Sequence, residues 1–530
     1  MASTITLLPD QVTHVDKLTK VLAERPFALD LSSLGSGKTY ASSFIAMREP
    51  ERFKHVVVIA PVSVKVKWLQ MKKDYGVPIS AALSYCELRS VKLKQPKHGL
   101  LHRRDYTVQM TIKGELVDVA KCDFTISEKY RKMVAEGMLL VIDEIQNIKN
   151  INPQFQAAQA LIKHVVDTFS PAAKSRALLL SGSPIDKAVQ AMHMMRGLGI
   201  MKHEKVATYD LQTNLMVWEG LQDILDYADA VNKEATDRLV VNSGGIRRMT
   251  MFLRGEGITR FCYDLFQKVI RPGISSSMPP PSLGYKLQTS NGFYHIIDDA
   301  EAKLLSDAVR NMDEVGKFQN QQLNGNMNLQ TLRSISVAMM QIETAKIGTF
   351  VRLAREALEN FPNQKIAICM NYSASVMDVV AALAEYNPLV LDGKISVANR
   401  SKVLNKFQAP TTESRLIIGN LSVMSTGIDL DDKDGRFPRI AFVSPNYSTI
   451  NLYQLGFRFL RADSKSGAEL YYVYGTHARE DAMLRVLATK SDVMKATTPD
   501  QVAHGIVFPS DSASFNEQTP EGFTPRKRVI

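Results

Sequence analysis

Cysteine is scarce in this sequence of 530 residues: only four occur, far apart, without a Cys-x-x-Cys pair. That spacing argues against a zinc site and against a disulfide scaffold, and it favours a reducing compartment. No apolar run approaches the ~18 residues that a membrane-spanning helix needs. The first ten residues also lack the basic flank and apolar core of a signal peptide. We therefore expect a soluble, intracellular protein with no membrane partner.

Acidic residues are outnumbered, since 54 Asp and Glu stand against 65 Lys and Arg and leave a formal net charge of +11. Spread over so long a chain, this excess permits nucleic acid binding without establishing it. Hydrophobic residues make up 45% and charged residues 22% of the chain, which excludes wholesale disorder and fibrous repeats. The length indicates about three or four domains or sub-domains.

Two stretches of the sequence alternate short apolar runs with longer amphipathic segments, which is the pattern of parallel α/β units. The predicted strands of the first stretch are Phe27–Leu31, Val56–Ala60, Asp123–Ile126, Met138–Ile142 and Ala177–Leu180. Those of the second stretch are Ile366–Met370, Leu389–Leu391, Leu416–Ile418, Ile440–Val443 and Leu470–Val473. Their length and aliphatic content predict strands that are covered on both faces.

The sequence between these stretches, about Met201 to Lys346, has a mostly helical pattern and is richer in charge, Gln and Asn. It is broken at Ser275–Pro281, where three prolines cannot continue a helix. The tail after about Thr497 is rich in Ser, Pro, Thr and Glu, and we expect it to be unstructured.

A glycine-containing loop follows the first predicted strand and opens an amphipathic helix; it ends Gly35-Ser36-Gly37-Lys38-Thr39. The glycines let the backbone fold so that its N–H groups face a phosphate chain, and the helix N-terminus adds partial positive charge. Lys38 would reach the β- and γ-phosphates, and the Thr39 hydroxyl would bind Mg²⁺. A turn beside an incidental lysine is the alternative, but the strand before and the helix after favour a phosphate-binding loop.

Two adjacent carboxylates, Asp143 and Glu144, end another apolar strand downstream. Asp143 can hold Mg²⁺, directly or through water, and Glu144 can polarise an attacking water. A surface acidic pair that caps the next helix is the alternative. Together with the phosphate loop, the pair favours nucleotide hydrolysis, and Gln146 would then lie near the γ-phosphate.

The order of these motifs resembles that of superfamily 2 helicases and translocases, nearer the Swi/Snf-like branch than the DEAD-box branch. In the first stretch the further matching segments are Leu8-Pro9-Asp10-Gln11, Ala60-Pro61, Phe124-Thr125-Ile126-Ser127 and Ser181-Gly182-Ser183-Pro184. In the second they are Asn371-Tyr372-Ser373, Leu391-Asp392-Gly393, Ser425-Thr426-Gly427-Ile428-Asp429-Leu430 and Gln454-x-x-x-Arg458-x-x-Arg461. The combination also resembles ATPases encoded by large DNA viruses and phages.

The resemblance implies an α/β fold with two RecA-like parallel-sheet motor lobes and a mainly helical middle region. Lobe 1, which would bind ATP, is expected at 1–200, the helical insertion or linker at 201–345, lobe 2 at 346–496 and a flexible tail at 497–530. ATP and Mg²⁺ are the implied cofactors. The implied track is DNA, with the duplex favoured because this branch tends to move without separating strands. RNA stays an alternative track, and transcription or repair proteins are candidate partners.

The resemblance also assigns roles to individual residues. The catalytic residues would be Lys38, Asp143, Glu144, Arg458 and Arg461, with the two arginines acting across the cleft from lobe 2. The nucleotide would be bound by Gln11, Gly35, Ser36, Gly37, Lys38, Thr39, Gln146, Gly427 and Asp429. Thr39 and Asp143 would hold the metal, and Gln11 would read the base. An exposed pair of cations on a helix face is the alternative for the two arginines.

Some features leave alternatives open. Ser32 stands where Ala or Gly usually begins the loop, a small-for-small change that we expect to be tolerated. The basic stretch with Lys92, Lys94, Lys97, His102, Arg103 and Arg104 is either a DNA-facing hairpin or a solvated loop. An RNA helicase and a non-catalytic motor-fold subunit of a transcription complex are the other functions. Intact Lys38, Asp143, Glu144 and Arg458 speak against the second of these.

Overall fold

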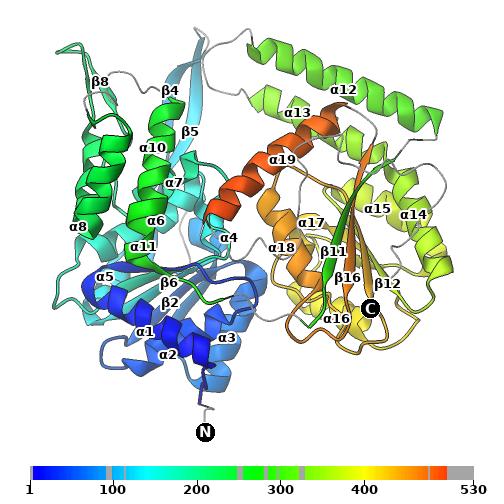
Figure 1. The fold of residues 1–530 in the computed structure, drawn as a ribbon, viewed down its shortest axis with the longest axis horizontal. Coiled ribbons are helices and arrows are strands. Elements are labelled where there is room, and N and C mark those ends of the chain that lie inside the picture. The colour runs from blue at the N-terminus through cyan, green and yellow to red at the C-terminus, as the bar shows by residue number, and fades with distance from the viewer. Residues whose placement is uncertain are drawn as a thin grey trace. The chain divides into compact units, whose positions relative to one another are not determined.

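The structure of the protein, a computed structural model, describes residues 4–90, 98–112, 115–246, 255–279, 284–294, 296, 298–320, 329–475 and 478–497. The chain divides into two compact units: unit 1 is Met1–Pro280 with Val493–Gln501, and unit 2 is Pro281–Asp492 with Val502–Ile530. Each unit contains a six-stranded sheet flanked by helices (Figure 1). The expected tail after Thr497 and the basic residues Lys92, Lys94 and Lys97 lie outside the described residues.

The sheet of unit 1 has the strand order β10-β1-β7-β6-β2-β3, and all neighbouring strands are parallel. Its strands are β1 (Phe27–Asp30), β2 (His55–Ala60), β3 (Ile79–Ser84), β6 (Met138–Asp143), β7 (Arg176–Leu180) and β10 (Ser275–Ser276). Every residue of β1, β6 and β7 is buried, as expected for aliphatic strands covered on both faces. Because β1, β7 and β6 are neighbours that run parallel, the loops that follow β1 and β6 leave the same edge of the sheet.

Two hydrophobic cores cover the two faces of this sheet, because successive strand residues point to opposite sides. Ala28, Val56 and Val58 pack into the core that includes residues of α1, α2 and α3. Leu29, Val57 and Ile59 pack into the core that includes residues of α6, α7, α8 and α10. The helices of unit 1 are α1 (Pro9–Glu24), α2 (Lys38–Arg48), α3 (Val62–Tyr75), α4 (Tyr85–Arg89), α5 (Glu128–Glu136), α6 (Pro153–Asp167), α7 (Val189–Gly197), α8 (Glu219–Asn242), α10 (Glu256–Leu265) and α11 (Arg271–Ile274).

The sheet of unit 2 has the strand order β11-β16-β15-β12-β14-β13, again with parallel neighbours throughout. Its strands are β11 (Leu287–Tyr294), β12 (Lys365–Met370), β13 (Leu389–Leu391), β14 (Leu416–Asn420), β15 (Arg439–Val443) and β16 (Ala468–Gly475). Its helices are α12 (Asp299–Asn320), α13 (Leu329–Thr344), α14 (Ile347–Asn360), α15 (Ser373–Ala382), α16 (Val397–Gln408), α17 (Leu421–Met424), α18 (Thr449–Phe459) and the first part of α19 (Ala478–Thr497). The end of α19, from Val493 on, belongs to unit 1. The predicted fold class, two RecA-like parallel-sheet lobes, is therefore confirmed.

One predicted strand is wrong in kind. Asp123–Ile126 is the end of β5 (Glu115–Ile126), which pairs with β4 (Leu101–Ile112) in a long antiparallel hairpin and belongs to neither parallel sheet. The apolar content of this segment is the same for a hairpin strand as for a buried strand, so the sequence did not distinguish the two. The hairpin contains His102, Arg103 and Arg104, which were expected either in a hairpin or in a loop.

The middle region contributes to both sheets. Within the expected helical segment 201–345, β10 joins the sheet of unit 1 and β11 joins the sheet of unit 2, while β8 (Thr208–Asp210) and β9 (Leu215–Val217) form a short hairpin. The two units meet in the chain between Pro280 and Pro281, inside this region. The expected domain limits at 200 and 345 stay a prediction.

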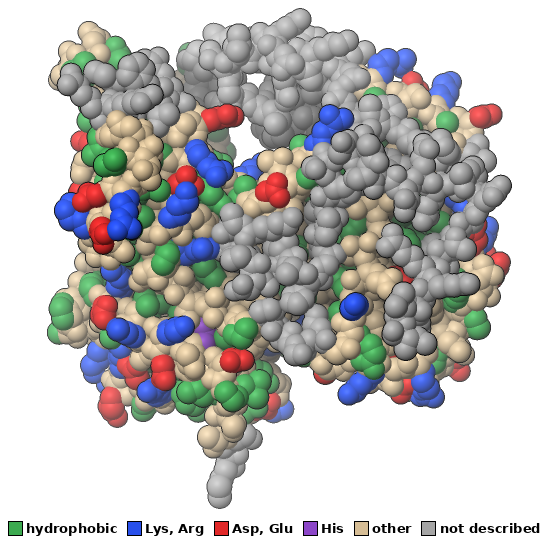
Figure 2. Space-filling view, in the orientation of Figure 1, with side chains coloured by type: hydrophobic (Ala, Val, Ile, Leu, Met, Phe, Trp, Pro, Cys, Tyr) green, Lys and Arg blue, Asp and Glu red, His purple; other side chains and the backbone are tan. Residues whose placement is uncertain are grey.

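Charge on the visible surface is mixed. In Figure 2, Lys and Arg side chains of the described residues are interspersed with Asp and Glu on the face that is drawn. Within the β4–β5 hairpin, Arg103 pairs with Asp105 at 2.8 Å and Arg104 pairs with Asp123 at 3.0 Å. These carboxylates offset the basic character that the sequence suggested for this segment. Among the described residues, no helix is both long and apolar enough to cross a membrane.

Candidate nucleotide site

The loop between β1 and α2 has the backbone of a phosphate-binding loop. Gly35 and Gly37 adopt φ values of +81° and +90°, which residues with a Cβ rarely adopt. Gly37 is the N-cap of α2, and Lys38 is the first residue of the helix. The unpaired N–H groups of the first helical turn and the helix dipole therefore meet at this loop, where both favour an anion.

The Lys38 ammonium rests on neutral backbone oxygens. Its Nζ donates to the carbonyl oxygens of Ser32 and Ser33 at 3.0 and 2.9 Å. Within the described part of the chain it makes no ion pair, although its charge helps to lower the pKa of Asp30. Exchanging two carbonyl oxygens for phosphate oxygens gains charge-assisted hydrogen bonds without breaking a salt bridge.

Gln11 in α1 packs directly against the loop. Its Nε2 donates to the carbonyl oxygen of Ser36 at 3.0 Å, and its Oε1 accepts from the N–H of Leu8 at 3.0 Å. A Cβ added at Gly37 would lie 2.3 Å from Gln11 Nε2, so the glycine is needed for this close approach as well as for its φ value. The structure thus brings Gln11 and the loop together, and recognition of a base by Gln11 stays a prediction.

Asp143 and Glu144 leave the end of β6 at the same sheet edge. The Trp68 indole N–H donates to Asp143 Oδ2 at 2.8 Å, and the Tyr85 hydroxyl donates to the carbonyl oxygens of Asp143 and Glu144 at 2.7 and 3.1 Å. Burial and repulsion from Glu144 raise the pKa of Asp143 to about 7, against the lowering effects of Trp68 and Lys38. A cation placed beside this pair would stabilise the charged form of both carboxylates and so offset the effects of burial and of their mutual repulsion.

Glu144 is held in an unusual backbone conformation. Its φ and ψ are +60° and +58°, in the left-handed region that only a few per cent of non-glycine residues adopt. Its Oε2 accepts from Gln146 Nε2 at 2.6 Å, and Gln146 Oε1 accepts from the Ser181 hydroxyl at 2.7 Å. A hydrogen-bonded chain therefore runs from Glu144 through Gln146 to the segment after β7.

The donor set at this edge fits ATP with Mg²⁺. Thr39, in the first turn of α2, supplies a hydroxyl oxygen, and Asp143 supplies a carboxylate, both hard oxygen ligands of the type that Mg²⁺ selects. Gly35, Ser36 and Gly37 place backbone N–H groups at the helix N-terminus for the phosphates. Mg²⁺, when bound, would neutralise charge on the phosphate oxygens.

The remaining predicted site residues lie in unit 2, in two segments that bind each other. The Arg458 Nε donates to the carbonyl oxygen of Ser425 at 2.9 Å, and the N–H of Leu430 donates to the carbonyl oxygen of Arg458 at 2.8 Å. The Arg461 guanidinium forms an ion pair with Asp429 and donates to the carbonyl oxygen of Ile428 at 3.2 Å. Gly427, with φ of +66°, allows the turn within the segment from Ser425 to Leu430.

The predicted residues thus fall into two groups. Gln11, the loop from Gly35 to Thr39, Asp143, Glu144 and Gln146 gather at one sheet edge of unit 1. Gly427, Asp429, Arg458 and Arg461 gather in unit 2. That both groups act on one nucleotide stays a prediction.

No protein-family model matches the sequence, and no curated protein matches it. Among solved structures, the chain is similar to the Sulfolobus solfataricus SWI2/SNF2 ATPase core in complex with dsDNA. The identity is 13%, the match covers 94% of this chain and 95% of that chain, and the TM-score is 0.31. With so low a TM-score, no functional conclusion follows from this likeness.

The residues that hold the acidic pair were not assigned from the sequence. Trp68 and Tyr85 contact Asp143 and Glu144 across separations of 58 to 75 residues in the chain. A buried indole N–H or phenol O–H needs a hydrogen-bond partner, so a Trp or Tyr in the sequence indicates that such a partner exists. It does not indicate which residue the partner is. Ser181 was noted only in a segment that matches the family pattern, and its bond to Gln146 gives it a specific contact at the site.

Proposed function

We propose that the protein is an ATP-hydrolysing motor that moves along nucleic acid, with duplex DNA as the favoured track. The observation that carries the proposal is the meeting of the Gly35–Thr39 loop with Asp143 and Glu144 at one sheet edge. A phosphate loop alone serves many binding functions. Next to a buried carboxylate pair, one member of which is held with φ of +60°, it has the parts that hydrolysis of a γ-phosphate requires.

The proposed mechanism relies on charge neutralisation and positioning more than on covalent chemistry. Lys38 and the loop N–H groups would bind the phosphates, Thr39 and Asp143 would hold Mg²⁺, and Glu144 would orient the attacking water. Arg458 and Arg461 supply positive charge from unit 2, a contribution typically worth about 10³–10⁵ in rate. Because the catalytic groups belong to two units, each cycle of hydrolysis would change how the units engage a bound strand.

The deciding experiment measures ATP turnover with duplex DNA, single-stranded DNA and RNA side by side. We expect duplex DNA to stimulate turnover most. Stimulation by RNA but not by duplex DNA would favour an RNA helicase. Absence of turnover with all three would reject the proposal in favour of a non-catalytic subunit.

A substitution ties the activity to the loop. Lys38→Ala removes the cation at the phosphates and should lower turnover by at least about 100-fold. Lys20→Ala is the matched control, because Lys20 is an exposed lysine of α1. Equal turnover in the Lys38→Ala variant and the control would reject the loop as the active site.

A further inference from the structure

The Ser32 hydroxyl has a partner far away in the chain. The backbone N–H of Met278 donates to Ser32 Oγ at 2.9 Å, and the exposed fractions of Ser32 and Met278 are 0% and 4%. The sequence offered Ser32 only as a tolerated departure from the Ala or Gly that usually begins such a loop. Neither Ala nor Gly has an oxygen that could accept this bond.

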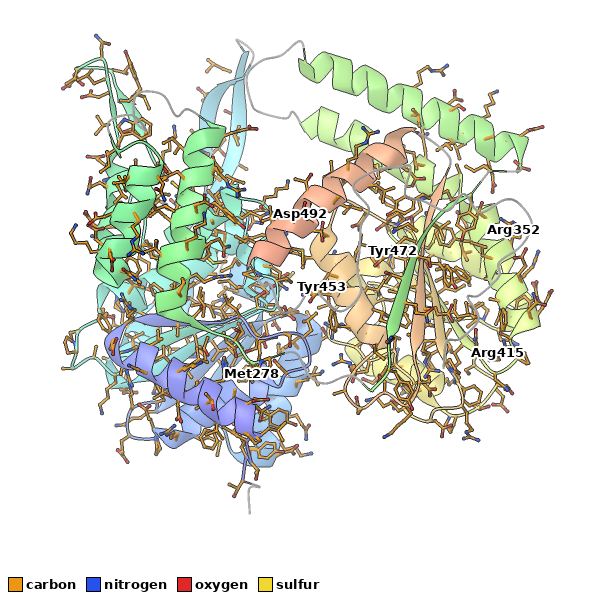
Figure 3. All side chains as sticks on the ribbon, in the orientation of Figure 1. Met278, Arg352, Arg415, Tyr453, Tyr472 and Asp492 are labelled. Carbon is orange, nitrogen blue, oxygen red and sulfur yellow. The ribbon has the colours of Figure 1, made fainter. Side chains whose placement is uncertain are left out.

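The Met278 contact lies in the segment through which the chain leaves unit 1. This segment, Ser275–Pro279, follows α11, and the boundary to unit 2 comes directly after Pro280. Its first two residues form β10, which pairs with β1, and the N–H of Leu31 donates to the carbonyl oxygen of Ser276 at 2.9 Å. The Met278 side chain, labelled in Figure 3, packs into the core formed with α1, α2 and α3.

The buried imidazole of His14 holds Ser276, a second residue of the segment. The Ser276 hydroxyl lies 2.9 Å from His14 Nδ1, and His14 Nε2 lies 3.1 Å from Asp30 Oδ2. Asp30 Oδ1 in turn accepts from the N–H of Ser32 at 3.0 Å. Burial would raise the pKa of Asp30, but the hydrogen bond and charge of His14 and the charge of Lys38 outweigh it and lower that pKa. The segment and the start of the phosphate loop are therefore held by one network.

Ser32 also contacts the phosphate-binding cation. Its carbonyl oxygen accepts from Lys38 Nζ at 3.0 Å, while its hydroxyl accepts from Met278. A phosphate that draws Lys38 away removes one of the bonds that fix Ser32. The Met278 N–H then depends on a serine that is less firmly held.

We propose that Ser32 is a positioning residue that transmits the state of the phosphate loop to Ser275–Pro279, the segment that leads into unit 2. This inference rests on the proposed function, because it needs a nucleotide to occupy the loop. Nucleotide binding loosens the bond between Met278 and Ser32, so the start of the connection between the units responds to the nucleotide. In a chain with Ala or Gly at this position the same loop would bind phosphate without this link.

Hydrogen exchange of the full chain, read by mass spectrometry, tests the link. Pro279, Pro280 and Pro281 have no amide hydrogen, so a peptide that ends in this run reports Met278 without interference from the residues after it. With a slowly hydrolysed ATP analogue and Mg²⁺, we expect slower exchange in the loop and faster exchange at Met278. The Ser32→Ala substitution removes the bond from the Met278 N–H and also the longer contact, 3.5 Å, between Ser32 Oγ and His14 Nε2. Without nucleotide, loss of the first bond should speed Met278 exchange in this variant by about tenfold. Adding nucleotide to this variant should slow exchange in the loop but cause no further change at Met278.

Ser33→Ala is the matched control, since the neighbouring Ser33 hydroxyl is buried but has no hydrogen-bond partner among the described residues. This control should keep the response of Met278 to nucleotide. Loop protection without any change at Met278 in the unsubstituted chain would overturn the link while leaving the proposed function intact. An equal effect of Ser33→Ala and Ser32→Ala would also overturn it. If nucleotide protects no part of the loop, the proposed function fails and the link fails with it.

Discussion

The two units place a strand, a loop and a helix in the same arrangement, but they treat the helix N-terminus differently. In unit 1 the loop between β1 and α2 has two glycines with positive φ and a lysine that rests on backbone carbonyls. In unit 2 the loop between β12 and α15 is filled by a carboxylate. Glu343, from the last turn of α13, accepts from the N–H groups of Asn371 and Tyr372 at 2.9 and 3.0 Å and from Asn371 Nδ2 at 2.7 Å.

The fold therefore places N–H groups that can bind an anion in one loop of each unit, and only the loop in unit 1 is available to an external anion. Backbone N–H groups at a helix N-terminus attract negative charge in either sheet. Unit 2 satisfies its own with Glu343, which is 2% exposed. In unit 1 the carboxylate of Asp30 accepts only from the N–H of Ser32, at the start of the loop. Among the described residues no carboxylate accepts from the N–H groups of Gly35 to Thr39, so an external anion can bind there. We therefore expect one nucleotide per chain, bound in unit 1.

The largest effect should come from Glu144→Gln. Glutamine keeps the size of the side chain but cannot polarise water as a carboxylate does, so kcat should fall by about 10²–10⁴-fold with little change in the KM for ATP. Titration of this variant with a fluorescent nucleotide should give one site per chain. Glu128→Gln is the control, because Glu128 has an 86% exposed side chain. Titration of a second site would mean that unit 2 also binds nucleotide. Turnover that survives Glu144→Gln would contradict the role of Glu144 in polarising water.

The open loop could be predicted from the sequence, whereas the filled loop could not. Gly37, Lys38 and Asp143 each belong to a short motif of neighbouring residues, so the local sequence pattern was enough to predict where they lie. Glu343 meets Asn371 because the last turn of α13 lies beside the loop after β12, and no spacing in the sequence indicates that contact. β10 was missed because two serines at the edge of a sheet carry no hydrophobic signal. The link from Ser32 to Met278 was missed for the same reason as Glu343, since it joins residues 246 apart.

Glu343→Ala should open the second loop at a cost in stability. It leaves the N–H groups of Asn371 and Tyr372 without their acceptor, whereas Asn371 Nδ2 keeps the carbonyl oxygen of Ser444 at 3.2 Å. We expect unit 2 to lose about 2–4 kcal/mol. The rate at which a thiol reagent labels Cys369, which is buried in β12, measures opening of this unit separately from unit 1. Inorganic phosphate should slow labelling of the variant more than that of the unsubstituted chain. Equal labelling of both chains without phosphate would contradict an anion requirement in the second loop.

Two glycine substitutions, one in each unit, test whether the first loop depends on backbone freedom, and we expect smaller effects from them. Gly37→Ala forces a Cβ into the left-handed region, at about 1–2 kcal/mol, and displaces Gln11 from the Ser36 carbonyl. The affinity of the Gly37→Ala variant for nucleotide should fall because of this strain and displacement. Gly393→Ala in unit 2 meets nothing within 4 Å and should leave stability unchanged or slightly higher. Thermal unfolding and nucleotide titration of the two variants check this, and equal effects would show that backbone freedom is not what distinguishes the first loop.

The smallest effect is expected from Asn446→Ala. Asn446 Nδ2 donates to Asn371 Oδ1 at 2.7 Å, and Asn446 Oδ1 accepts from the N–H of Ser448 at 2.8 Å. It therefore supports the second loop without touching the carboxylate that fills it. Removing it should cost about 0.5–1.5 kcal/mol, the net value of an ordinary hydrogen bond, with Cys369 labelled only slightly faster. If Asn446→Ala instead exposes Cys369 as much as Glu343→Ala does, the second loop is held by its whole polar network. The negative charge of Glu343 would then not be what distinguishes this loop from the one in unit 1.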